Sequence, residues 1–247
     1  MILRRLTKHV KDQNWFAVGL DFLIVVLGIL IAFQITNWAD ERSQAEQHER
    51  YYQRLKTDFT TIDEKIDDHI RFYEDRIGKA AYILDVIRTP EDEFDPDAID
   101  RPRFESALEG LGNMRIPVGE SATYTEMVAA GQLSAIKNEA LRERLAEYDR
   151  QTSINLEVFR ATYDVINPQV RIVWRHFKID AVLEQNDLSG IRNNVLSYDL
   201  ATMRADPEFD VAVMIMKNYM SNNLGVRQTE KQLSTEILAL ISEDAAP

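Results

Sequence analysis

The sequence predicts an all-α protein in which an N-terminal transmembrane helix runs into a long amphipathic helix and an antiparallel extracytoplasmic helical bundle follows. Three observations predict this fold. About 24 largely apolar residues lie between Trp15 and Trp38. Apolar residues then recur at helical spacing as far as Ile87, and two later stretches repeat that spacing. No strand hairpin is recognisable, and each apolar stripe must be buried on another helix.

Residues 15–38 form the predicted transmembrane helix, because roughly 20 apolar residues cross a bilayer as a helix. Trp15 and Trp38 frame the run, as amphipathic rings do at the two membrane interfaces. The flanking charges are basic before the run and acidic after it: Arg4, Arg5, Lys8 and Lys11, then Asp40 and Glu41. The positive-inside rule therefore makes residues 1–14 a cytoplasmic basic tail and places the rest of the chain outside.

A cleaved signal peptide is the main alternative, because the uninterrupted apolar core from Phe22 to Phe33 is only about 12 residues long. No small-x-small cleavage site follows this core, where Phe33, Gln34 and Ile35 stand instead. The sequence therefore favours an uncleaved anchor. A buried helix of a soluble protein is the third interpretation.

One face of the predicted membrane helix is small and polar. At 100° per residue it carries Ala17, Asp21, Val25, Gly28, Ala32 and Ile35. Small residues let helices approach closely, and a carboxylate inside a membrane is costly unless it meets a partner or water. We interpret this face as a contact surface for copies of the chain or for another membrane protein. Two alternatives stay open: Asp21 snorkels to the cytoplasmic interface, or it lines an ion pathway.

Residues 39–88 form the predicted long amphipathic, coiled-coil-like helix. Its apolar stripe begins with Tyr52, Leu55, Phe59, Ile62, Ile66 and Ile70 and reaches Ile87 in heptad spacing, with one stutter after Ile66. Neither Pro nor Gly interrupts residues 38–71, so the membrane helix is expected to continue without a break. Such a stripe serves a bundle within one chain or a coiled coil between chains, and the first is favoured.

Residues 89–120 are read as an acidic loop, "TPEDEFDPDAIDRP", and a short helix over 103–111. Residues 121–247 complete the bundle. Ser121 is the expected cap of a helix that ends at Gly131. Asn138 is the expected cap of a second long helix that reaches Phe177, with a kink or a restart at Pro168.

After a break at "EQNDLSG", Asp206 and Pro207 should open a third long helix. Gly225, in the polar segment "SNNLGVRQTEKQ", suggests a bend or a looser stretch in that helix.

The composition offers no catalytic, cofactor or metal site. Without cysteine there is no disulfide, thiolate nucleophile or Cys-ligated zinc. The histidines lack metal spacing, and His69 is read as a polar residue tolerated on a long helix. The net charge of −12 disfavours nucleic acid as a partner. An enzyme is therefore the least supported class.

Two blocks resemble a bacterial family of uncharacterised single-pass membrane proteins known as a domain of unknown function. They are "DFLIVVLGILIAFQITNW", with its Gln34–Asn37–Trp38 exit, and "AAGQLSAIKNEALRERLAEY", which is similar to the family's Ser-Ser-Gly-x-Leu-x-x-Ile-Lys-Asn signature. Ala129 and Ala130 replace the two serines. The resemblance implies a bacterial inner-membrane protein with most of its chain in the periplasm, and no activity.

These observations favour an oligomeric scaffold or an accessory subunit of a membrane complex. An extracytoplasmic ligand sensor that signals through a partner is one alternative. An oligomeric pore or ion-coupled assembly that uses Asp21 is the other.

Overall fold

The computed structural model describes residues 15–183 and 191–244, which fall into two compact units that meet between Tyr51 and Tyr52. Helix α2 (Trp15–Arg88), 74 residues long, contributes to both. The expected continuation of the apolar helix into the amphipathic one is thus confirmed. The basic tail (1–14) and the expected break at 184–190 lie outside the described residues.

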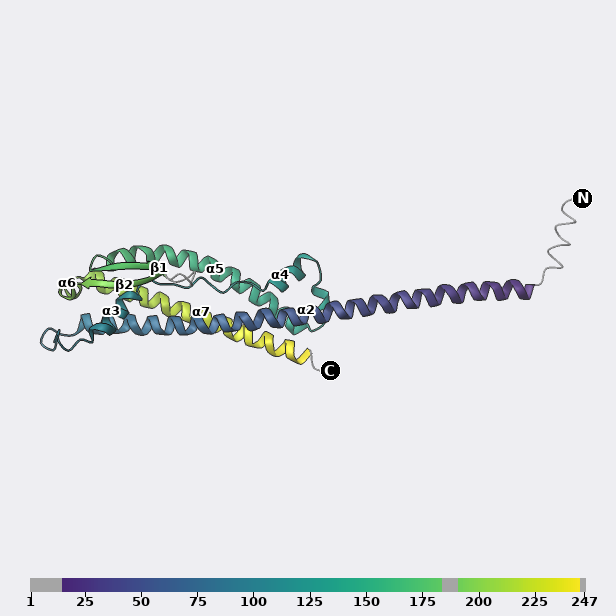
Figure 1. Cartoon of the computed structure of the whole chain (residues 1–247), viewed down its shortest axis with the longest axis horizontal. Helices are drawn as coiled ribbons and strands as arrows, with labels where there is room; N and C mark the ends of the chain where they lie inside the picture. The colour runs from purple at the N-terminus through teal and green to yellow at the C-terminus, as the bar shows by residue number, and fades with distance from the viewer. Residues whose placement is uncertain (1–14, 184–190, 245–247) are drawn as a thin grey trace, which may run out of the picture. The chain divides into compact units, whose positions relative to one another are not determined.

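The second unit is mainly helical. After α2 come α3 (Arg101–Glu109), α4 (Ala122–Ala129), the 3₁₀ turn η1 (Leu133–Ala135), α5 (Glu139–Val173), strands β1 (Phe177–Leu183) and β2 (Ile191–Tyr198), α6 (Leu200–Ala205) and α7 (Pro207–Asp244). Within this unit α5 and α7 lie along the second half of α2 (Figure 1).

The three long helices of the second unit, α2, α5 and α7, do not simply alternate in direction along the chain. At one end of the unit, Asp244 at the end of α7 accepts hydrogen bonds from Tyr52 and from Asn138, the residue before α5. At the other end, Arg88 pairs with Asp210 near the start of α7. Helix α7 is therefore antiparallel to both partners, whereas α5 is parallel to α2. The segment between α2 and α5 returns along the unit, which makes this order possible.

The prediction of a protein without strands is wrong for residues 177–183 and 191–198. β1 and β2 pair antiparallel, with Phe177 opposite Tyr198 and Ile179 opposite Val195. The register shifts between Lys178 and Ile179, which leaves Leu196 as the extra residue of a β-bulge. Apolar and polar residues alternate at the start of β1, the period of a half-buried strand. The sequence reading had assigned Phe177 to the preceding helix, which ends at Val173.

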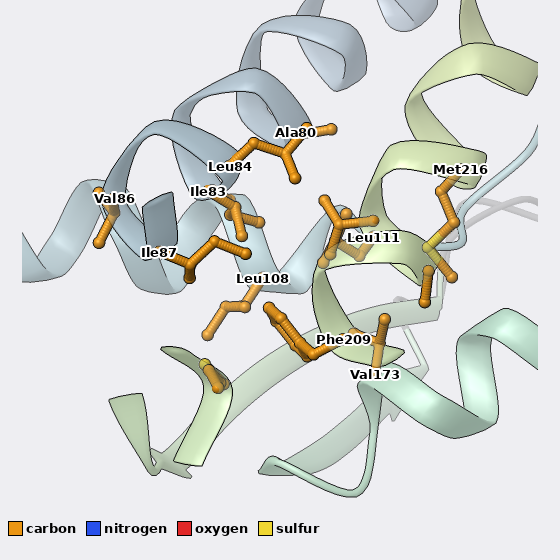
Figure 2. Packing of buried hydrophobic residues seen from close by; sticks show 14 of the residues in the cluster. Ala80, Ile83, Leu84, Val86, Ile87, Leu108, Leu111, Val173, Phe209 and Met216 are labelled. Carbon is orange, nitrogen blue, oxygen red and sulfur yellow. The ribbon is translucent and has the colours of Figure 1, made fainter. Parts of the chain in front are cut away.

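A large apolar cluster fills the end of the unit where α2 stops. Ile83, Phe104 and Phe209 are fully buried there, from α2, α3 and α7. Figure 2 shows Ile87 facing Leu108 and Phe209 in this cluster. The hairpin covers the core with Ile179, Val195 and Tyr198.

The local signals at the helix ends are confirmed. The side chain of Ser121 accepts a hydrogen bond from the Tyr124 amide, and Asn138 does so from Leu141. Gly131 has φ +67°, the left-handed conformation that glycine adopts without strain. Asp206 accepts from the amide of Glu208, so α7 begins as expected.

At two positions where the sequence predicts a possible break or bend, the helix continues. Helix α5 passes through Pro168 as one element, so a restart there is wrong. Helix α7 likewise passes through Gly225 without an interruption.

Candidate functional site

The apolar part of α2 belongs to the first unit and is not covered by the described chain. One described helix is long and apolar enough to cross a membrane, with a most apolar window of mean hydropathy 2.2 of which 0% is buried. Its large side chains, such as Phe22 (70% exposed) and Phe33 (63%), are open on every side of the helix. In a soluble protein, so much exposed apolar surface would require a partner.

The predicted contact face lies on this helix. Asp21, Val25, Gly28, Ala32 and Ile35 are all exposed. Apart from the two neighbouring residues and the backbone of the helix itself, no described atom lies within 4 Å of the position that a Cβ on Gly28 would take. Ala17 belongs to the helix, but its side chain lies outside the described ones. The structure thus places the carboxylate among small residues on a helix that the described chain leaves open.

The outer stripe of α2 lies within the second unit, where most of it is buried. Leu55, Phe59 and Ile66 are 0% exposed, and Ile70 is partly buried. The Phe59 ring meets that of Tyr148 on α5 edge to face, with 5.1 Å between the ring centroids. The stripe is therefore packed against the chain's own helices, as in the interpretation of a bundle in cis.

In the middle of α5, polar side chains are buried and apolar ones exposed, the reverse of the pattern at its ends. Polar residues Thr152, Asn155 and Thr162 are buried there, whereas Ile154 (41%) and Val158 (50%) are exposed. A helix buries its apolar side unless the interior offers hydrogen-bond partners for polar groups. The reason for the inversion lies on α7, opposite Asn155.

Asn155, Arg227 and Glu230, which are buried, and His69, which is partly buried, form what we call the buried charge cluster. Arg227 and Glu230, on one face of α7, pair at 2.8 Å between Nη1 and Oε2, with side chains 3% and 0% exposed. Asn155 on α5 donates to the other carboxylate oxygen of Glu230 at 2.5 Å. Burial raises the pKa of Glu230, and the attraction of Arg227 opposes that rise.

The ion pair is incompletely satisfied. Among the described residues, Nε and Nη1 of Arg227 and Oε2 of Glu230 lack a well-aligned hydrogen bond, although Nη1 and Oε2 are close. Such an arrangement is costly, because the groups give up water without regaining all their hydrogen bonds.

His69 on α2 completes the cluster. Its Nδ1 is buried and has no hydrogen-bond partner in the part of the chain that the structure describes. Burial, followed by the positive charges of Arg227 and Arg115, lowers its pKa to about 4. The imidazole is therefore neutral at pH 7.

A second set of charges joins α2 to α7 beside the cluster. Lys231 Nζ lies 2.8 Å from Asp63 and 2.6 Å from Asp67, and Ser234 donates to the other oxygen of Asp63 at 2.8 Å. These groups are more exposed than Arg227 and Glu230. They are paired and satisfied, so they fix how α7 lies on α2.

The sequence reading missed the buried charge cluster. It placed Arg227 and Glu230 in a polar, looser stretch of α7, and it read His69 as a tolerated residue. A signal was present: polar Asn155 and Thr162 stand at core-facing positions of α5. Residues 15–183 and 191–244 contain no group of three or more His, Asp or Glu that could hold a metal ion.

The fold and the open apolar segment define a mainly helical protein with one candidate membrane-spanning helix near its N-terminus. Comparison with family models, curated protein sequences and solved structures finds no match to this chain.

Proposed function

We propose that the protein is a membrane-anchored helical-bundle scaffold or accessory subunit of a complex in the bacterial inner membrane. In this proposal residues 15–38 cross the membrane once, the N-terminus is cytoplasmic and the second unit is periplasmic. The protein performs no chemistry of its own, and its role is to hold a membrane partner, either further copies of itself or a different protein.

One observation carries the proposal: Asp21 lies on an exposed, small-residue face of an apolar helix. A carboxylate inside a bilayer is stabilised by water, by the interface or by polar groups of a neighbouring helix. Gly28 and Ala32 continue the same face and would allow a neighbour to approach closely. The second unit buries its own stripe, so the stripe does not compete with the membrane face for a partner.

Native mass spectrometry of the full-length protein, extracted gently from its own membrane, tests the proposal beside an Asp21→Leu variant. We expect the wild type to appear as a discrete homo-oligomer or bound to another membrane protein, and the variant to lose that assembly. Asp40→Leu is the matched control, because it removes a carboxylate of the same helix beyond Trp38 and should keep the assembly.

Each remaining outcome contradicts part of the proposal. A monomer for both wild type and variant would leave Asp21 as a snorkelling residue and remove the contact face. An Asp21→Asn variant that assembles normally but loses an ion flux measured in liposomes would replace the scaffold with an ion-coupled assembly.

A further inference from the structure

The buried charge cluster is poised to respond to protons. Arg227 is 2% exposed, and its charge is balanced within the cluster by one carboxylate, that of Glu230. His69 Nδ1 is buried without a hydrogen-bond partner among the described residues, and the charge of Arg227 lowers the pKa of the ring. A second cation in this enclosure would meet a buried positive charge at reduced dielectric, where like charges repel strongly.

We propose that His69, Arg227 and Glu230 form an acid-sensitive latch. On acidification, a proton taken up by His69 places a second cation beside Arg227 and loosens the packing of α2 against α7. The latch is a property of the second unit and is independent of the contact face at Asp21.

The charged groups that act on His69 come from α2, from α7 and from the segment between α3 and α4. On α2 itself, Lys65 disfavours and Asp68 favours the protonated imidazole. From α7 Arg227 disfavours it, as does Arg115 from the segment between α3 and α4. Burial adds to the opposition, so the folded state resists protonation of His69 overall.

The direction of the effect follows from linkage. Because the pKa of His69 is lower in the folded chain than in the unfolded chain, the unfolded chain binds more protons between pH 6.5 and 4. The free energy of unfolding therefore falls as the pH falls through this window. A pKa change from 6.5 to about 4 corresponds to an unfolding equilibrium constant about 60-fold larger at pH 4.5 than at pH 7.

Glu230 acts in the opposite direction. Burial raises its pKa, so its own proton uptake favours the folded state as the pH falls. The His69 contribution is therefore isolated as the difference between wild type and a His69→Gln variant, in which the Glu230 contribution is common to both.

Urea unfolding of the full-length protein in detergent, followed by circular dichroism at 222 nm from pH 7 to 4.5, tests the latch. Over this range the folding equilibrium constant should fall for the wild type by a factor at least ten times larger than for His69→Gln. Thr60→Gln, at an exposed position of the same helix in the second unit, is the control and should retain the wild-type pH dependence. Equal pH profiles for wild type and His69→Gln would overturn the proposal.

A direct titration covers the case in which His69→Gln does not fold. NMR of wild-type protein with ¹³C-labelled histidine rings should show one ring that stays neutral well below pH 6 and whose titration coincides with loss of native signals. If every histidine ring titrates near pH 6.5 in the folded protein, there is no latch.

Discussion

The apolar end of the second unit and its charged middle are built from the same helices but are held together differently. At the apolar end, Ile83, Phe104 and Phe209 are fully buried by side chains that carry no polar group. In the middle, Glu230 and Asn155 are buried just as deeply, beside Arg227. The first region gains stability from area removed from water, whereas the second must compensate the loss of hydration with a few polar contacts.

This difference indicates separate roles for the two regions. Apolar packing is strong but tolerates many arrangements, because any side chain of suitable volume contributes. A buried ion pair contributes little net stability, yet it penalises every register in which its partners do not meet. We infer that apolar packing, of which this end is one part, supplies most of the stability and that Glu230, held between Arg227 and Asn155, selects how α5 and α7 align.

The largest effect is expected at the apolar end. Phe209→Ala removes a ring that is 0% exposed and leaves a cavity among α2, α3 and α7. Replacements of this kind cost about 3–5 kcal/mol, so we expect a loss of that size in urea unfolding.

Met214→Ala, on the same helix and 38% exposed, serves as the control and should cost much less. Equal losses for Phe209→Ala and Met214→Ala would contradict the assignment of the core to this end.

The charged middle should respond to single and double replacements in opposite ways. Glu230→Leu leaves Arg227 as an unpaired buried cation and should cost about 3 kcal/mol or more. The double variant Arg227→Met, Glu230→Leu removes both charges and should recover most of that loss or exceed wild-type stability.

The same urea titration measures both variants. A triple variant that adds Asn155→Leu to the double variant also removes the remaining buried amide. If the double variant is less stable than the single one, the ion pair is a net source of stability and the comparison between the two regions fails.

Patterns local in sequence predicted the helical part of this fold. The stripe from Tyr52 to Ile87 carries its own periodicity, and the caps at Ser121 and Asn138 require only a polar residue before an apolar run. The hairpin was not found because seven residues of β1 follow a helix whose apolar spacing extends to Phe177. Strand pairing depends on residues distant in sequence, so the spacing of apolar residues alone did not distinguish a strand from a continued helix.

The charge cluster depends on tertiary contacts alone. Asn155 and Glu230 are 75 residues apart, and their hydrogen bond exists because α5 runs parallel to α2 and antiparallel to α7. A sequence shows which residues are polar, but not that three polar residues on different helices share one enclosure. The membrane face at Asp21 is the converse case, because the periodicity of one helix is enough to define it.

The smallest effect is expected at the end of the second unit that lies opposite the apolar end. Asn138 accepts from the Leu141 amide at 3.1 Å and donates to Asp244 at 3.3 Å, so it caps α5 and contacts the end of α7. Asn138→Ala should cost about 1 kcal/mol, the usual size for a lost N-cap. Asn167→Ala, at an exposed interior position of the same helix, should leave stability unchanged or raise it slightly. Hydrogen exchange should then show faster opening in the first turn of α5 for Asn138→Ala alone, and protection unchanged at Phe209 would show that the apolar end holds independently of this cap.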